Sequence, residues 1–181
     1  MKKNAGKEIV QIGAPILRQK ALPVAPEEFG GKALKDILRA MEKALNATED
    51  GAALAAPQIG VSKRIFILSS RVFGPEGEHG SKNLPLIYIN PRIVRHARKR
   101  ELMDEGCLSV RGKYGTIKRA RGVTLEAYDE EGNKFTRGAG GLLAQVFQHE
   151  CDHLDGVLFV DRAEEVWRIP PSEEHHSAQS P

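Results

Sequence analysis

The spacing of apolar residues predicts one helix near each end of the chain. Between residues 34 and 45, apolar side chains recur three or four positions apart, which places them on one stripe of an amphipathic helix that should end near residues 46–50. Residues 141–154 (GLLAQVFQHECDHL) predict a second helix, and Gly156 lies where that helix should stop. The stripe of the first helix consists of Leu34, Ile37, Leu38, Met41 and Leu45.

The apolar segments between these helices have the pattern of β-strands. Residues 64–68 (RIFIL) predict a buried strand, and residues 84–95 alternate well enough for another, with Pro91 marking an edge or a break. Residues 123–137 predict a hairpin with its turn at residues 131–133. The middle of the chain is therefore expected to be rich in β-structure.

Four other segments carry weaker signals. Residues 9–26 contain three prolines and predict an extended N-terminal arm. Residues 51–60 (GAALAAPQIG) are small and bounded by glycine, which favours a tight loop, and residues 71–83 predict an exposed loop. Residues 157–162 (VLFVDR) predict a short strand or an extended segment.

These elements together predict an α+β fold. We expect antiparallel or mixed β-sheets around the C-terminal helix, with one amphipathic helix toward the N-terminus. Residues 1–168 should form a single domain. The polar, proline-containing residues 169–181 should form a disordered tail.

Composition narrows the class of protein. A chain that is 40% hydrophobic and 28% charged, with 18 Gly and 10 Pro in 181 residues, is neither fibrous nor wholly disordered. Its apolar runs are far shorter than the roughly 20 residues of a membrane helix, and its basic N-terminus lacks the apolar core of a signal peptide. We therefore expect a cytoplasmic protein with no membrane partner. The net charge of +3 does not require a nucleic acid, and no DNA partner is expected.

The predicted C-terminal helix carries the motif HExxH. His149 and His153 are four residues apart, so both imidazoles lie on one helical face and can bind one metal ion. Glu150 lies beside the first of them and is placed to take a proton from an activated water molecule. This pattern indicates a catalytic metal site.

Such a site needs a third protein ligand. In the longer motif HExxHxxGxxH a third histidine would stand at position 159, where this chain has Phe159. Glu164 and Glu165 are a second option, but no clear second helix presents them. Cys107 is the remaining candidate, because a thiolate is a strong ligand that a loop can deliver from elsewhere in the chain. Cys151 should point away from the metal and pack in the core, since it lies about 200° round the helix from His149.

Three motifs give the chain its resemblance to a known family. In order, they are residues 51–58 (GAALAAPQ), residues 105–109 (EGCLS) and residues 148–154 (QHECDHL). With these motifs the sequence resembles the peptide deformylases, from near Ile9 to about Asp161. The resemblance implies that residues 1–168 form a single deformylase-like metal hydrolase domain that removes the N-formyl group from the N-terminal methionine of nascent peptides and releases formate.

The resemblance also implies roles for individual residues. Cys107, His149 and His153 would hold one divalent metal ion, Fe²⁺ by preference, with Zn²⁺ or Ni²⁺ able to substitute. Glu150 would act as the general acid and base. Gln58 and the backbone N–H of Leu108 would stabilise the negative charge on the formyl oxygen.

A substrate pocket and partners follow from the same resemblance. Helical spacing puts Leu142 and Val146 on the side of the metal ligands, so they are expected to line the pocket for the methionine side chain, together with Gly51 and Ala53. N-formylmethionyl peptides are the expected partners, and the ribosome a transient one. Two positions depart from the family pattern: Ala53 stands where Gly is usual, and Arg111 where Pro is usual.

Two alternatives to deformylation remain open on sequence grounds. One is a zinc peptidase of the HExxH kind, which Phe159 disfavours. The other is a degenerate deformylase-like protein that binds peptide or ribosome without catalysis. Glu150 and Gln58 argue against it, because a purely structural metal site needs neither a base nor an oxyanion donor.

Overall fold

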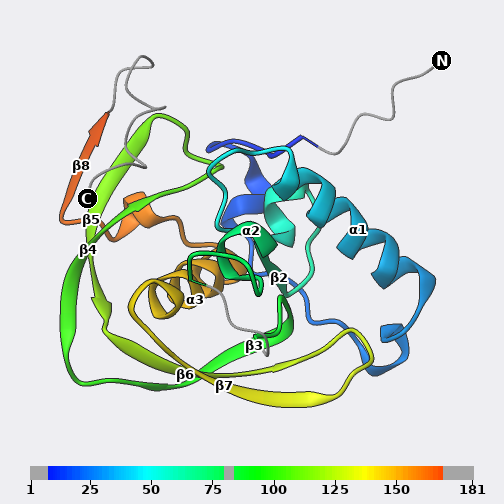
Figure 1. Ribbon diagram of the computed structural model, residues 1–181. Coiled ribbons are helices and arrows are strands. Elements are labelled where there is room, and N and C mark those ends of the chain that lie inside the picture. The colour runs from blue at the N-terminus through cyan, green and yellow to red at the C-terminus, as the bar shows by residue number, and fades with distance from the viewer. Residues whose placement is uncertain (1–7, 80–83, 169–181) are drawn as a thin grey trace.

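Two antiparallel β-sheets enclose a central helix in the computed structural model, which describes residues 8–79 and 84–168 (Figure 1). The larger sheet has the order β1-β2-β3-β6-β7 and the smaller one the order β4-β5-β8. The predicted tail at residues 169–181 lies outside the described residues. The strands of the larger sheet are β1 (Ala53–Ala55), β2 (Ile65–Leu68), β3 (Ile87–His96), β6 (Gly122–Tyr128) and β7 (Lys134–Gly140), and those of the smaller are β4 (Arg100–Gly106), β5 (Lys113–Ala120) and β8 (Glu165–Arg168).

The two sheets are joined by a pair of bent strands. The chain runs from β3 into β4, turns back through residues 107–112, and returns along β5 and β6. Because β3 pairs with β6 and β4 with β5, the same two chain segments cross from one sheet to the other side by side. Cys107 lies in the loop between β4 and β5, at the free end of this long hairpin.

Three α-helices accompany the sheets in the described part of the chain: α1 (Lys32–Asn46), α2 (Ser70–Phe73) and α3 (Gly141–Leu154). Helix α3 contacts strands of both sheets, and Figure 1 shows it in the middle of the molecule, with β4 and β5 to its left and β6 and β7 beneath. Short 3-10 turns at Pro15–Arg18, Pro26–Glu28, Ala56–Ile59 and Phe159–Asp161 complete the structure. None of the described helices is long and apolar enough to cross a membrane.

Strand β2 shows why its sequence is continuously apolar. Ile65 and Ile67 pack in one cluster with Leu38 and Met41 of α1, whereas Phe66 packs on the opposite face in the cluster around α3. A strand with both faces covered has no solvent side and needs no polar alternation. Full burial of each such side chain contributes about 1.5–3 kcal/mol to folding.

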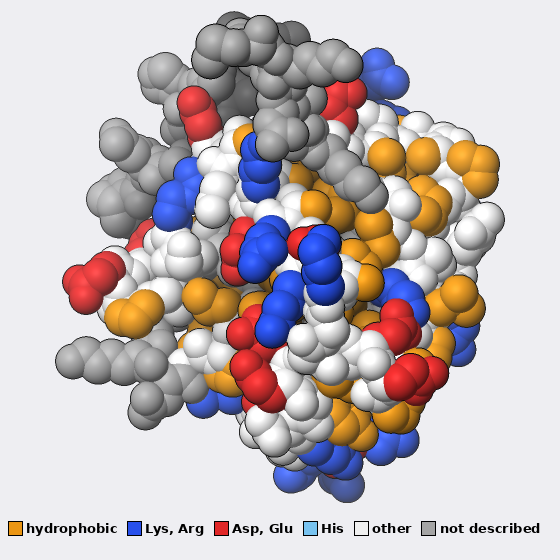
Figure 2. Space-filling model, turned by 90° about the vertical axis from the view of Figure 1, so that its right-hand side faces the viewer, with side chains coloured by type: hydrophobic (Ala, Val, Ile, Leu, Met, Phe, Trp, Pro, Cys, Tyr) orange, Lys and Arg blue, Asp and Glu red, His pale blue; other side chains and the backbone are white. Residues whose placement is uncertain are grey.

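The outer face of α1 is polar, as an amphipathic helix requires. The Asp36 carboxylate forms ion pairs with Lys32 at 2.8 Å and with Arg39 at 3.3 Å, which lie about one turn away on either side. Figure 2 views this side of the molecule and shows Lys, Arg, Asp and Glu side chains intermingled. Such exposed pairs contribute little to stability, so α1 is held chiefly by its buried stripe.

Helix α3 ends next to Gly156, as the sequence predicted. Asp155 follows the last helical residue, and Gly156 has a φ of +77°. A Cβ at Gly156 would lie 2.8 Å from the backbone carbonyl of Arg18. Both the left-handed backbone and the close approach of the N-terminal arm therefore require glycine here.

The antiparallel α+β class is confirmed, while several local predictions need correction. Residues 157–162 form no strand: Phe159–Asp161 is a 3-10 turn, because Leu158 and Phe159 fill an apolar cluster and the Asp161 side chain accepts a hydrogen bond from the Leu158 N–H. The segment 51–60 contains the short strand β1 as well as a turn. The segment 71–83 includes the end of α2, whose Phe73 is fully buried.

Candidate metal centre and active site

Three side chains that can bind a metal ion meet between α3 and the β4–β5 loop. One ligand atom from each of Cys107, His149 and His153 lies within 4.8 Å of the other two. The Cys107 Sγ is 3.2 Å from the His153 Nε2. Ligands bonded to one ion at about 2.0–2.3 Å must approach each other this closely. The geometry therefore fits one ion bound by a thiolate and two imidazoles.

The His149 ring is oriented by a buried carboxylate. Its Nδ1 lies 2.9 Å from the Oε2 of Glu105, which leaves Nε2 free to face the metal position. Metal-binding histidines are commonly held in this way by a second partner. Burial alone would raise the pKa of Glu105, but hydrogen bonds from Arg119 and His149 lower it to about 2. Glu105 thus carries a full negative charge behind the ligand.

A buried network of charges extends from this carboxylate. Arg119 donates from Nε and Nη2 to Glu105 at 2.7 and 2.9 Å, and from Nη1 to Asp152 at 2.7 Å. Arg162 lies 2.9 Å from the other oxygen of Asp152. Sequence reasoning missed Glu105 and Asp152, although both stand within the motifs beside metal ligands. No local signal marked Arg119, which is separated from both motifs in the sequence.

Glu150 places a buried carboxyl group next to the His149 side chain. The residue is only 4% exposed, and its Oε2 has no hydrogen-bond partner among the described residues. Burial raises the pKa of Glu150 to about 7, with the nearby Glu105 charge adding to the effect and His149 opposing it. A carboxyl group poised in this range can both accept and return a proton near neutral pH.

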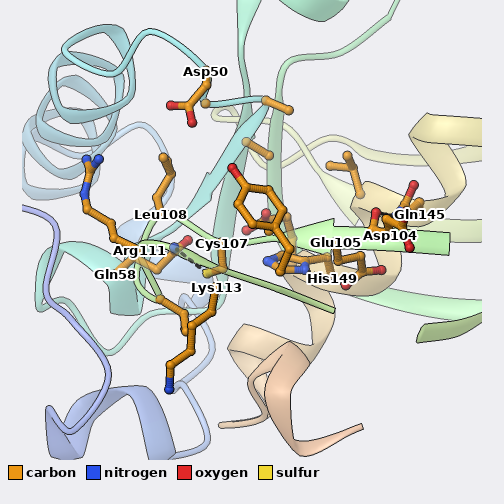
Figure 3. A pocket seen from close by; sticks show the side chains of 18 of the residues that line it. Asp50, Gln58, Asp104, Glu105, Cys107, Leu108, Arg111, Lys113, Gln145 and His149 are labelled. Atoms are coloured by element: carbon orange, nitrogen blue, oxygen red, sulfur yellow. Dashed lines mark hydrogen bonds and ion pairs between the residues drawn. The ribbon is translucent and has the colours of Figure 1, made fainter. Parts of the chain in front are cut away.

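The Gln58 side chain and the backbone N–H of Leu108 lie next to Cys107. The Gln58 Oε1 accepts a hydrogen bond from the Ala55 N–H at 2.8 Å, which turns the amide nitrogen toward the site. That nitrogen lies 3.1 Å from the Ser109 hydroxyl and 3.7 Å from the Cys107 Sγ (Figure 3). No described residue accepts a hydrogen bond from the Leu108 N–H. Within the described part of the chain the Leu108 N–H is thus unpaired beside Cys107, and the Gln58 amide nitrogen, which donates to Ser109 and Cys107, lies next to it.

A cavity of about 360 Å³ opens onto these groups. Gly51, Ala53, Leu142 and Val146 all line it, and Leu142 is exposed to solvent. A Cβ on Gly51 would lie 2.3 Å from the Thr48 hydroxyl oxygen, so the space at position 51 fits only glycine.

Two neighbouring residues explain smaller features of the sequence. The Gln145 Nε2 donates to the Asp104 carbonyl at 2.8 Å, so this polar residue ties α3 to β4 at the cavity edge. Phe159 stacks on the His149 ring at a centroid separation of 6.5 Å and is 1% exposed. The residue at the position of the longer motif's third histidine therefore packs against the His149 ring. Cys151 belongs to the apolar cluster, and burial raises its pKa to about 12.

Comparison with known proteins places this geometry in a family. Residues 6–168 match the sequence model of the polypeptide deformylases. The chain belongs to this family. Its function is the metal-dependent deformylation of nascent peptides, with a single divalent metal ion, and this chain is an enzyme of that class.

Individual relatives are similar in sequence to this chain over most of its length. The peptide deformylase of Thermomicrobium roseum is 40% identical, covering 97% of each chain. That of Halothermothrix orenii is 43% identical, covering 86% of this chain and 92% of its own. The similarity therefore extends across both sheets and α3.

Solved structures match the fold as well. A peptide deformylase from Synechococcus elongatus in complex with actinonin is 37% identical, with a TM-score of 0.73 over 87% of this chain and 78% of that one. A Met-Ala-Ser-bound peptide deformylase from Acinetobacter baumannii is 31% identical, with a TM-score of 0.76 over 87% and 99%.

Proposed function

We propose that this chain hydrolyses the formamide bond of N-formylmethionyl peptides in the cavity beside Cys107. Cys107, His149 and His153 are the proposed ligands of its metal ion. The observation that carries the proposal is the convergence of these three donors with a buried carboxyl group and two N–H donors at one end of a cavity. Three protein ligands leave a coordination position open, as catalytic sites require.

The ligand chemistry fits a single divalent transition metal. One thiolate and two imidazoles suit Fe²⁺, Zn²⁺ and Ni²⁺ better than Mg²⁺ or Ca²⁺. Fe²⁺ is the proposed native ion on the strength of the family resemblance. When bound, the ion supplies a Lewis acid that makes water nucleophilic at neutral pH.

The chain's own residues then divide the remaining work. Glu150 takes a proton from the attacking water and later gives it to the departing amine, so that one water molecule and one formamide become formate and a free amino terminus. The Gln58 amide and the Leu108 N–H donate to the formyl oxygen as negative charge develops there. Each such donor can contribute about 3 kcal/mol to the transition state.

Substrate and domain assignments extend the proposal. Gly51, Ala53, Leu142 and Val146 are proposed to receive the methionine side chain, since they line the cavity next to the ligands. Residues 1–168 are proposed to act as one catalytic domain, which the family match over 6–168 supports. Because the substrates are nascent peptides, we propose that the protein meets them transiently at the ribosome.

The decisive experiment measures formate release from a formyl-Met peptide by protein loaded anaerobically with Fe²⁺. Glu150→Gln should retain the metal and lose activity by about 10²–10⁴-fold, because the proton carrier is removed and the ligands are kept. Cys107→Ser should lose bound metal, whereas Cys151→Ala should keep it. Equal metal content in the two cysteine variants would contradict the ligand assignment. Near-native turnover in Glu150→Gln would exclude Glu150 as the base.

A further inference from the structure

Two cations line the same cavity as the metal ligands. Arg111 comes from the β4–β5 loop and Lys113 from the first position of β5. Arg111 is exposed and Lys113 half-buried. In the described part of the chain, neither side chain forms an ion pair or a side-chain hydrogen bond with any carboxylate. Their charges are therefore available to a ligand that enters the cavity.

The charges around the cavity are separated in space. Figure 3 shows Arg111, Lys113 and Gln58 on the side of Cys107, while Asp104 and Gln145 lie beyond His149 on the opposite side. The Asp104 carboxylate, which accepts a hydrogen bond from the Thr116 hydroxyl at 2.9 Å, belongs to that opposite side. The Glu105 carboxylate is paired with the Arg119 guanidinium. The Cys107 side of the cavity is therefore its cationic side.

Besides Asp104, Glu105 and the buried Glu150, one further acidic residue of the cavity has to be weighed against these cations. Asp50 also lines the cavity, and no ion pair joins it to either cation among the described residues. Two positive charges against one negative charge leave this part of the rim net positive. A substrate carboxylate that reaches it gains attraction, and a substrate ammonium group is repelled.

From this arrangement we propose that Arg111 and Lys113 determine substrate specificity by favouring formyl-Met peptides with an Asp or Glu side chain in the first two positions after methionine. The inference rests on the proposed function, because it concerns how the peptide beyond the formyl-Met group is selected. The ligand chemistry is a carboxylate. Its two sources are an acidic side chain and the C-terminus of a short peptide, and we assign the side chain.

The test uses peptides capped with a C-terminal amide, so that a side chain supplies the only variable charge. Two series, fMet-X-Ala-Ala-NH₂ and fMet-Ala-X-Ala-NH₂, carry Glu, Gln or Lys at X. In at least one series kcat/KM should be about tenfold higher for Glu than for Lys at low ionic strength, with Gln between them. The difference should lie in KM, because the contact forms with substrate and transition state alike. It should shrink near about 0.5 M salt, where charges are screened.

Variants assign the effect to the two residues. Arg111→Gln and Lys113→Gln should each reduce the Glu-to-Lys ratio by about threefold. Asp50→Asn should increase it. The matched control is Arg95→Gln, which removes one positive charge from an exposed position outside the cavity lining. Its ratio should equal that of the unmodified enzyme.

A binding measurement checks the same preference without catalysis. The deformylated products with Glu and Lys at X should inhibit as competitors, with the Glu product the tighter one by a similar factor. Equal rates for Glu, Gln and Lys in both series would overturn the inference while leaving the proposed function intact. An equal loss of selectivity in Arg95→Gln would also overturn it. Only the absence of formate from every peptide would count against deformylation itself. Selectivity seen solely with uncapped peptides would assign the cations to the C-terminus.

Discussion

Helix α3 is held on two sides by opposite kinds of chemistry. On one side Phe147 packs against Phe66 and Tyr88, whose rings stack at 4.6 Å, and Phe147 meets Tyr88 edge-on at 4.9 Å. On the other side Glu105 and Arg119 form a buried ion network with Asp152 of the helix. The apolar side sets where the helix lies, since dispersion and burial have little directional preference. The charged side sets how the His149 ring is turned, because hydrogen bonds do.

The two sides should also differ in their tolerance of change. Apolar clusters accept substitutions that keep volume and shape. A buried ion network accepts removal of a partner poorly, because the remaining charge stays buried without compensation. Precision at the metal site is thus obtained by placing the less tolerant interactions next to the ligand.

Among these changes, removal of Arg119 should lower the stability of the protein the most. Arg119→Met leaves Glu105 and Asp152 without their shared counter-charge, and we expect a loss of about 3–5 kcal/mol in the free energy of unfolding. Urea denaturation with matched metal content measures it. The control Arg121→Met removes an exposed arginine that lies 3.7 Å from Glu101, and should change stability little. Similar midpoints for the two variants would show that the network is not stabilising.

Glu105→Gln should weaken metal binding by about 10–100-fold, because an amide orients and polarises His149 less than a carboxylate does. Competition with a chelator measures the affinity, and Glu101→Gln, a change at a half-buried surface position in the same strand, is the control. Unchanged affinity in Glu105→Gln would separate this carboxylate from the site.

The stability difference between the parent enzyme and Glu105→Gln should depend on pH. The folded-state pKa of Glu105 is about 2, below its ordinary value of 4.5. Its contribution to stability is therefore present above about pH 4.5 and is lost as the pH falls toward 2. The stability gap between the parent enzyme and Glu105→Gln should narrow over that window. A gap that stays constant with pH would contradict the depressed pKa.

On the apolar side, Phe147→Leu should cost about 1–1.5 kcal/mol in stability through lost ring contacts and a small cavity. Metal affinity should remain at the parent value, because His149 is turned by the opposite side of the helix. Thermal denaturation and chelator competition measure the two quantities. A loss of metal affinity comparable to that of Glu105→Gln would erase the distinction between the two sides.

The smallest expected change is at Ala53, which lines the cavity from β1 and pairs with Leu68. Ala53→Gly should lower stability by about 0.5–1 kcal/mol through the freer unfolded chain. It should also raise kcat/KM on a formyl-Met peptide, because the removed methyl widens the groove. Enzymes with matched metal content provide the comparison. No gain in rate would mean that the strand already accommodates the methyl.

Charged strands were the hardest part of the fold to predict. Strands β4 and β5 carry charged residues on both faces, so neither shows the apolar alternation that predicts a strand. Their inner face mixes the apolar Ile117 with charged residues of the site: Glu105 and Arg119 are buried and bond to residues of α3. The charged residues of the site therefore interrupt the apolar alternation by which these two strands could have been predicted.

The sequence by itself determined the local features: the apolar stripe of α1, the end of α3 at Gly156, and the pairing of His149 with His153 on one helical face. These follow from a helical period that acts within a few residues. Only the tertiary structure decided which distant groups meet. Cys107 and His153 are 46 positions apart, and Arg119 and Asp152 are 33 positions apart. Their convergence depends on the bend that carries β4 and β5 out of the larger sheet and against α3, which no local pattern encodes.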